Sequence, residues 1–275
     1  MPELPETETI ARDLNESVAG RRIDSVKVTK SDVLREVAAR TFVKRLKNAT
    51  IIGSWRRAKL IVTDLSTGDR LVVQPRFTGA MIVEHAHLDR AQLAYSTLRL
   101  GLDDGRALHY CDVRRLGTVA LMSPRRFEEY SSALGIEPLD QTFTSEQLSG
   151  VLRVTNQPVK KVLMDQRRLA GIGNIYANES LWRAGIDPSR AASSIDNREA
   201  TRLRDEIVAV LNESISLRGT SFRDYRDAKG ERGRFAERLQ AYGREGLQCF
   251  RCGHRLIGTH AIDGRATVFC ATCQA

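Results

Sequence analysis

Four of the five cysteines form two pairs near the end of the chain. Each pair has the spacing C-x2-C, and seventeen residues separate Cys252 from Cys270. In a reducing compartment, thiolates at this spacing are typical of a closed tetrahedral zinc site and not of two disulfides. The sequence therefore predicts one structural zinc ion on Cys249, Cys252, Cys270 and Cys273. Cys111 lies apart in an apolar segment and is predicted to be a buried small side chain.

The chain opens with MPELPETET, which places a proline and a glutamate directly behind the first methionine. Because Pro2 is small, we expect Met1 to be removed, which leaves a secondary terminal amine beside the Glu3 carboxylate. An α-amine has a reference pKa of about 8, against about 10.4 for lysine, so more of it is a neutral nucleophile at neutral pH. The same residues are common where a helix begins. From this segment alone, a helix start is the favoured interpretation.

A glycine-rich segment in the second half, DQRRLAGIGNIYANESL, contains Gly171 and Gly173 directly before a predicted helix that begins at Asn174. The glycines permit a tight turn, and the first N–H groups of a helix can bind a phosphate beside the Asn174 side chain. A plain turn between helices would need one such glycine and not the whole segment.

The overall composition is that of a basic globular protein. The chain has 275 residues, with 43 Lys or Arg against 34 Asp or Glu and a formal net charge of +9. This length suits about two domains. The charge favours a polyanionic partner, with nucleic acid first and a membrane surface second. No apolar run approaches the length of a membrane span and no signal pattern opens the chain, which predicts a cytosolic protein.

The patterning changes along the chain. Apolar residues spaced four apart predict a helix over residues 7–19, and short alternating segments over residues 21–122 predict a β-rich domain of two packed sheets. After residue 123 the period becomes helical. A polar, Gly- and Arg-rich loop, residues 218–235, precedes the cysteine segment.

Taken together, PELPETET, LMDQRRLAGIGNIYANESL, AYGREGLQC and the four-cysteine ending resemble the bacterial formamidopyrimidine-DNA glycosylase and endonuclease VIII family over essentially the whole chain. The resemblance implies an α+β multidomain protein that binds DNA. Its expected parts are a catalytic β-sandwich with an N-terminal helix (1–124), a hinge (125–150), a helix-two-turn-helix domain with a lesion-capping loop (151–240) and a zinc ribbon (241–275).

The resemblance also assigns roles to residues. The amine of Pro2 is expected to attack C1′ of the damaged nucleotide and form a Schiff base, and Glu3 is expected to move protons at the sugar. Glu6 matches a second carboxylate with a supporting role. Lys59, in WRRAKLIV, matches a lysine that a hairpin presents to the DNA backbone. Arg265, in IDGRATVFC, matches a phosphate-binding arginine that the zinc hairpin holds rigidly.

An enzyme that extrudes a base must fill the gap in the duplex. The family uses a methionine, an arginine and a phenylalanine, and this chain departs from that pattern. Phe77 stands in place of the methionine and Leu116 in place of the phenylalanine, while Arg114 is kept and is expected to meet the orphaned base, for which the family prefers cytosine. Gln74 replaces a common histidine and Val113 a usual proline. Phe77 and Leu116 can still wedge between bases; the alternative is that both belong to the core of the sandwich.

The resemblance predicts a bifunctional DNA glycosylase and AP lyase that removes 8-oxoguanine and formamidopyrimidines from double-stranded DNA in the bacterial cytosol, close to the nucleoid. The loop 218–235 favours oxidised purines. Two alternatives remain at this point: a related enzyme for oxidised pyrimidines or abasic sites, and a damaged-DNA-binding protein without turnover. Zinc is the one expected bound ion, no redox or nucleotide cofactor is expected, and a monomer is the expected state.

Overall fold

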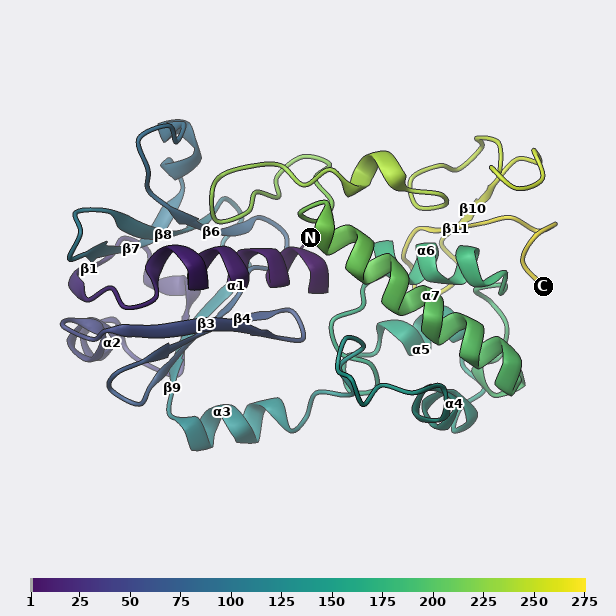
Figure 1. Cartoon of the computed structure of the whole chain (residues 1–275), viewed down its shortest axis with the longest axis horizontal. Helices are drawn as coiled ribbons and strands as arrows, with labels where there is room; N and C mark the ends of the chain where they lie inside the picture. Colours follow the sequence, from purple (N-terminus) through teal and green to yellow (C-terminus); the bar gives the residue numbers. More distant parts are fainter. Residues whose placement is uncertain (1) are drawn as a thin grey trace. The chain divides into compact units, whose positions relative to one another are not determined.

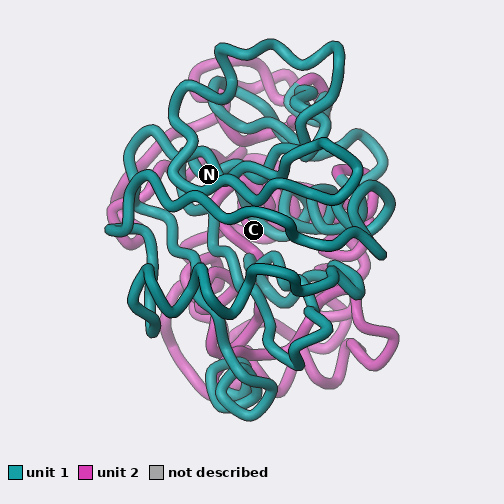
Figure 2. Tube along the Cα trace, turned by 90° about the vertical axis from the view of Figure 1, so that its left-hand side faces the viewer, with its two compact units in different colours: residues 1–132, 215–236 teal, residues 133–214, 237–275 magenta. Residues whose placement is uncertain are grey.

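The computed structural model describes residues 2–275; Met1, and with it the prediction that it is removed, lies outside this range. The chain forms two compact units (Figures 1 and 2). Unit 1 contains residues 1–132 and 215–236, and unit 2 contains residues 133–214 and 237–275. The chain therefore passes from unit 1 to unit 2, returns once, and ends in unit 2.

Unit 1 contains two sheets and a long N-terminal helix. A four-stranded antiparallel sheet has the order β1-β7-β8-β6, and a five-stranded sheet has the order β2-β9-β5-β4-β3, in which only β2 and β9 pair in parallel. The bounds are α1 Leu4–Val18, β1 Ile23–Val28, β2 Leu34–Arg35, α2 Ala39–Leu46, β3 Ile51–Arg57, β4 Leu60–Leu65, β5 Arg70–Gln74, β6 Gly79–Val83, β7 Ser96–Leu102, β8 Ala107–Asp112, β9 Thr118–Met122 and α3 Pro124–Ser131.

One apolar core lies between these elements. Ile10, Leu14 and Val18, the residues that predicted the first helix, are buried in it together with residues of both sheets. Helix α1 packs against β3 and β4, and its axis runs along the sheets (Figure 1). The amphipathic face of α1 thus fixes where the chain's N-terminal residues lie on the sandwich.

Unit 2 is helical and ends in a two-stranded hairpin. The bounds are α4 Ser145–Arg153, α5 Val159–Met164, α6 Asn174–Ala184, α7 Asn197–Ser216, β10 Ile257–Thr259 and β11 Thr267–Phe269. Strands β10 and β11 pair antiparallel between the two cysteine pairs. With the sandwich of unit 1, this arrangement confirms the predicted α+β fold class.

The local structure differs from the sequence prediction in three places. The first helix begins at Leu4 and not at residue 7. Strand β5 ends at Gln74, so Phe77 lies in a turn and not in a strand. Residues 215–236, predicted with the helical domain, pack with unit 1. The predicted hinge contains the boundary between the units at residues 132 and 133, but it also contains most of α4.

Candidate functional site

The N-terminal segment is buried and tightly held. Pro2 is buried, and Glu3, at 3% exposure, is the N-cap residue of α1. The carboxylate of Glu6 accepts the backbone N–H of Glu3 at 2.8 Å and that of Thr220 at 2.7 Å. The interpretation of the N-terminal segment as a helix start is therefore correct, although the helix predicted from apolar spacing was expected to begin only at residue 7. Since one carboxylate binds both backbone groups, it also joins the proposed nucleophile segment to the polar loop 218–235.

Lys59 lies in the turn between β3 and β4, which is fixed on both sides. Its neighbour Ala58 adopts a left-handed conformation with φ of 52°. The carbonyl of Ala58 accepts the hydroxyl of Thr7 at 3.5 Å and the guanidinium of Arg56 at 3.1 Å. Arg56 in turn pairs with Glu8 of α1 at 2.8 Å. Helix α1 therefore positions Lys59 in the same unit as Pro2 and Glu3.

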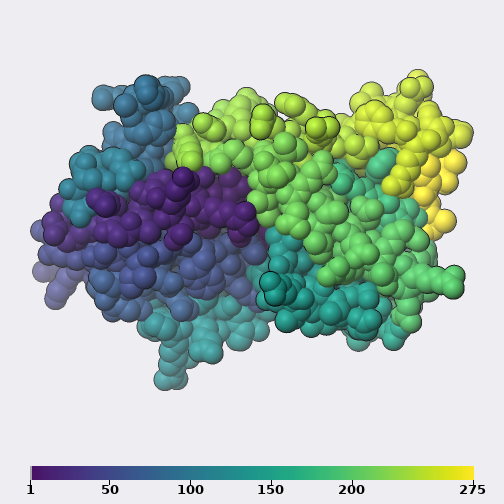
Figure 3. Space-filling model, in the orientation of Figure 1, coloured from purple at the N-terminus to yellow at the C-terminus, as the bar shows by residue number. Residues whose placement is uncertain are grey.

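The polar loop 218–235 is anchored to α1 at its base. The Nε of Arg218 donates to the buried Asp227 at 2.6 Å, and its Nη2 pairs with Asp13 of α1. Burial raises the pKa of Asp13, and Arg218 partly offsets that shift. Lys229 pairs with Glu16 at 3.2 Å. Figure 3 shows this yellow-green segment covering the surface beside the purple helix.

Phe77 and Leu116 are exposed, at 48% and 49%, so the core alternative for these residues is wrong. Each follows an arginine, Arg76 or Arg115, that has a positive φ of 52°. Val113 is 54% exposed in the same loop as Leu116. Unit 1 therefore presents apolar side chains to solvent from two strained loops. Exposed apolar side chains that lie near one another often mark a binding surface.

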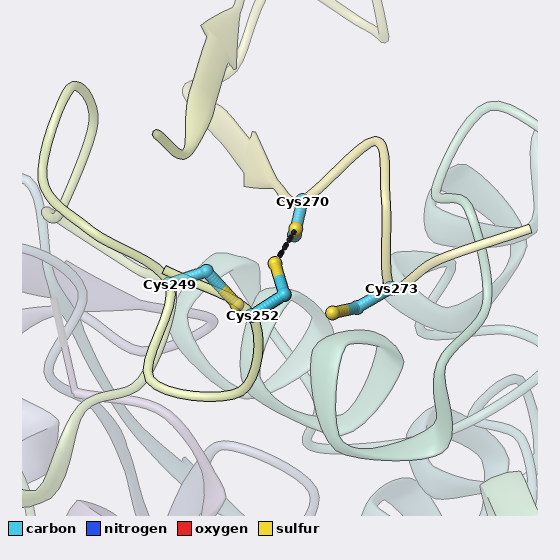
Figure 4. Close-up of side chains that lie close together, drawn as sticks. All are labelled: Cys249, Cys252, Cys270 and Cys273. Atoms are coloured by element: carbon cyan, nitrogen blue, oxygen red, sulfur yellow. Dashed lines mark hydrogen bonds between the residues drawn. The ribbon is translucent and has the colours of Figure 1, made fainter. Parts of the chain in front are cut away.

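The four paired cysteines come together in unit 2, as Figure 4 shows. Their sulfur atoms all lie within 4.8 Å of one another, and the Sγ atoms of Cys252 and Cys270 are 3.4 Å apart. Four sulfurs at about 2.3 Å from a tetrahedral zinc ion would be separated by about 3.8 Å. The donor set thus fits a metal ion that binds thiolates.

Asn174 and Arg265 belong to unit 2 and are close in the fold. The Asn174 side chain donates to the carbonyl of Ala266 at 3.0 Å, directly after Arg265. The same carbonyl accepts the ammonium group of Lys160, which is fully buried, at 3.0 Å. Arg265 itself is half exposed and lies 3.8 Å from Asp263. Side chains of the helical segments therefore bind the backbone of the cysteine hairpin next to Arg265, at the predicted phosphate-binding residues.

Three polar residues that organise these sites were missed from the sequence, and two of them, Lys160 and Glu179, are buried. Gln166 builds the glycine turn, because its side chain accepts the N–H of Gly171 at 2.8 Å and donates to the carbonyl of Ile172 at 2.7 Å. Glu179 is fully buried and accepts backbone N–H groups of Gln240, Ala241 and Tyr242. A charged residue inside an apolar helical segment was the available signal for Glu179 and Lys160.

The predicted site residues of unit 1 are Pro2, Glu3, Lys59, Phe77, Arg114 and Leu116. Those of unit 2 are Asn174, Arg265 and the four cysteines. Within the described residues, no helix is both long and apolar enough to cross a bilayer. Each unit thus holds its own group of predicted functional residues.

The comparisons with known proteins agree with this architecture. Residues 1–119 match the family described as formamidopyrimidine-DNA glycosylase N-terminal domain, and residues 134–226 match the formamidopyrimidine-DNA glycosylase H2TH domain. A formamidopyrimidine-DNA glycosylase of Desulfitobacterium hafniense is 38% identical over 100% of both chains.

Solved structures of similar proteins have the same fold. The MutM (Fpg) protein of Thermus thermophilus has a TM-score of 0.87 and 34% identity over 99% of this chain and 98% of its own. Lactococcus lactis Fpg, at 31% identity over 99% of both chains, was solved with DNA that contains an abasic site (TM-score 0.90) and with DNA that contains an oxidised pyrimidine (TM-score 0.90). A mutant of it was solved with Fapy-dG DNA (TM-score 0.91).

The β-sandwich with its buried N-terminal segment, together with the helical unit and its four-cysteine hairpin, is the architecture of a DNA glycosylase of DNA repair. The chain belongs to the formamidopyrimidine-DNA glycosylase family. DNA is its partner.

Proposed function

We propose that this glycosylase removes oxidised purines, 8-oxoguanine and formamidopyrimidines, and then cleaves the abasic site as a lyase. The supporting observation is the Glu6 carboxylate, which binds the backbone of both Glu3 and Thr220. It joins the segment of the nucleophile to the loop 218–235, which resembles the lesion-capping loop of the 8-oxoguanine branch. The Lactococcus lactis relative solved with Fapy-dG DNA supports the same substrate class.

The first step uses Pro2 as the nucleophile. Its secondary amine attacks C1′, the N-glycosidic bond breaks, and the bonding electrons leave with the base, which takes up a proton. Opening of the sugar ring, with Glu3 moving a proton to the ring oxygen, gives an iminium ion. An amine of ordinary α-amino pKa is neutral often enough at pH 7 to act in this way.

The lyase steps follow from that cation. The iminium is an electron sink, so the 2′ proton becomes acidic and its removal expels the 3′ phosphate. A second elimination expels the 5′ phosphate, and water then hydrolyses the adduct to free the Pro2 amine. These steps need no redox partner, because each nucleophile brings a lone pair and each leaving group departs with the electron pair of the bond that breaks.

The remaining predicted residues hold the DNA. Lys59, Asn174 and Arg265 bind phosphates, which positions the duplex without reading its sequence. Phe77 and Leu116 enter the stack, and Arg114 meets the orphaned base. The four cysteines would hold one zinc ion, which would keep the hairpin of Arg265 rigid. Because four thiolates would leave no coordination position open, the function of the ion would be structural. The enzyme acts as a monomer in the bacterial cytosol.

Borohydride trapping tests the proposal. We expect a covalent protein–DNA product on a duplex that carries 8-oxoguanine opposite cytosine and on an abasic duplex, and a product lost or strongly slowed in Pro2→Gly. A wild-type protein that binds the 8-oxoguanine duplex but gives no product on either substrate would contradict the proposal and favour a binding protein without turnover. Intact-mass spectrometry establishes whether Pro2 is the terminus in the sample used.

A second candidate keeps the chemistry and changes the lesion. Phe77 and Leu116 depart from the residues that the family uses, and the Lactococcus lactis relative was also solved with oxidised-pyrimidine DNA. Trapping on an oxidised pyrimidine or on the abasic duplex, with none on 8-oxoguanine, would favour this candidate.

A further inference from the structure

The two exposed loops that carry Phe77 and Leu116 are joined through one buried carboxylate. Asp112 is the last residue of β8 and is 1% exposed. Its Oδ1 accepts the hydroxyl of Thr78, and its Oδ2 accepts the backbone N–H of Gly117 at 2.8 Å. Since Thr78 and Gly117 belong to different loops, a single side chain fixes both.

Thr78 adds a second connection between the loops. A hydroxyl can donate one hydrogen bond and accept others. While it donates to Asp112, the Thr78 oxygen also accepts the backbone N–H of Arg114 at 3.0 Å. A continuous chain of hydrogen bonds therefore runs from the loop of Arg114 and Leu116, through Thr78 beside Phe77, into the Asp112 carboxylate.

Tyr110 and two glycines complete the network. The buried Tyr110 hydroxyl donates to Oδ2 of Asp112 at 3.1 Å, and burial raises its pKa well above the ordinary value, so it stays a donor. A Cβ on Gly117 would lie 1.9 Å from the Tyr110 oxygen and 2.8 Å from the carbonyl oxygen of Gln74. A Cβ on Gly79 would lie 2.3 Å from the Pro75 carbonyl oxygen. The loops touch at the glycines, where a larger residue does not fit.

We infer that Asp112 and Thr78 are positioning residues that hold Phe77, Arg114 and Leu116 as one rigid wedge, an inference that rests on the proposed function. Two arguments support it. The left-handed conformations of Arg76 and Arg115 cost energy that the surrounding contacts must supply. In addition, side chains that are ordered before they enter a duplex lose less conformational entropy when they bind.

Thr78→Val is the sharpest variant, because it removes the hydroxyl and keeps the shape of the side chain. Asp112→Asn is the second variant and Thr78→Ser the conservative rescue. Thr63→Val is the matched control: Thr63 is a buried hydroxyl of the same unit that pairs with Ser54 at 2.9 Å and touches neither loop in the hydrogen-bond network.

Two substrates separate wedge positioning from chemistry. The first is a duplex with 8-oxoguanine opposite cytosine and 2-aminopurine beside the lesion, which reports base unstacking by fluorescence. The second is an abasic site in a bulge without an opposing base, where no base must be extruded. Thr78→Val and Asp112→Asn should slow excision of 8-oxoguanine from the first duplex and reduce the rise in 2-aminopurine fluorescence. A slowing of about tenfold is the expected effect of losing a hydrogen bond to a charged group. Borohydride trapping on the second should stay at the wild-type rate.

Thr78→Ser should restore excision, and Thr63→Val should match wild type. The inference is overturned if Thr78→Val excises and unstacks like wild type, or if it loses trapping on the bulged abasic site to the same extent. A wild-type protein that traps on neither substrate would instead contradict the proposed function. In that case the 2-aminopurine signal, which requires binding alone, would still decide whether Thr78 and Asp112 position the wedge.

Discussion

His109 is a buried histidine whose titration should appear in the stability of unit 1. It is 6% exposed, and its Nδ1 lies 2.9 Å from the hydroxyl of Ser96. Burial lowers its pKa below the ordinary value, although Glu84 opposes the shift. The unfolded chain therefore binds this proton more readily, so the contribution of His109 to the free energy of unfolding is complete above about pH 6.5 and is lost as the pH drops below that value.

Urea unfolding between pH 7.5 and pH 5 measures this effect. In His109→Gln the loss of stability on acidification should be smaller than in wild type. His87→Gln, at an exposed position of the same unit, is the control for the loss of a histidine that is not buried. An equal slope in His109→Gln and wild type would contradict the assignment.

Glu179 shows how one side chain can hold a backbone segment. Its Oε1 accepts the N–H groups of Ala241 and Tyr242, and its Oε2 accepts that of Gln240. Glu179→Gln would place an amide donor against one of these N–H groups. We expect a loss of about 2 kcal/mol in the free energy of unfolding. Denaturant titration checks this value, and the exposed Glu237→Gln should change it by less than about 0.5 kcal/mol.

At the scale of elements, the loop 218–235 should depend on Arg218 for its order. Removing this cation leaves Asp13 and the fully buried Asp227 without their shared partner. Arg218 is partly exposed, so Arg218→Gln should cost about 3 kcal/mol, near the low end for a broken buried pair. Hydrogen exchange should show protection lost first in residues 217–235. Arg223→Gln, at an exposed position of the loop, should leave that protection unchanged.

The sequence predicted elements well where the chain shows a clear period. Segments with alternating or helical patterns became β1, β3, β4, β7 and α1, at nearly the expected positions. Strands β6 and β8 are buried along their whole length, so they lack the alternation that marks a half-exposed strand. Helix α5 ends at Met164, where the Asp165 and Gln166 side chains bind the backbone of the turn that follows.

Site residues were predictable where their partners are near in sequence or where they match the motifs of a known family. The four cysteines were found from spacing alone, and they gather as predicted. The role of Asp112 was hidden, because its acceptor bonds reach Thr78, 34 residues away. Glu179 likewise binds a segment about 62 residues further along the chain. A single sequence without its fold contains no sign of such pairings.

At the scale of the whole molecule, the two tryptophans report on separate units. Trp55 belongs to unit 1, and Trp182 of unit 2 lies in the apolar cluster with Cys249 and Cys270. Removal of zinc by a chelator should change the fluorescence of a Trp55→Phe protein, in which only Trp182 emits. It should leave the fluorescence of a Trp182→Phe protein unchanged. Metal binding and folding of such a segment are coupled, so the change should reverse when zinc is returned.

The same sample should lose DNA affinity while it keeps its nucleophile. With Arg265 no longer held, one phosphate contact disappears, and the slope of log affinity against log salt should fall by about 1. Trapping on an abasic duplex at saturating protein concentration should continue. Unchanged DNA affinity after verified zinc loss would contradict the structural role of the metal.

The return of the chain to unit 1 also has a consequence for its synthesis. Glu6 and Asp13 bind Thr220 and Arg218, which follow them by 214 and 205 residues. On the ribosome, the first helix therefore emerges long before the residues that cover its carboxylates. A product truncated before residue 215 would leave this unit unfinished, so neither unit can be obtained by cutting the gene once. Only a nascent chain that has grown past residue 236 can complete unit 1.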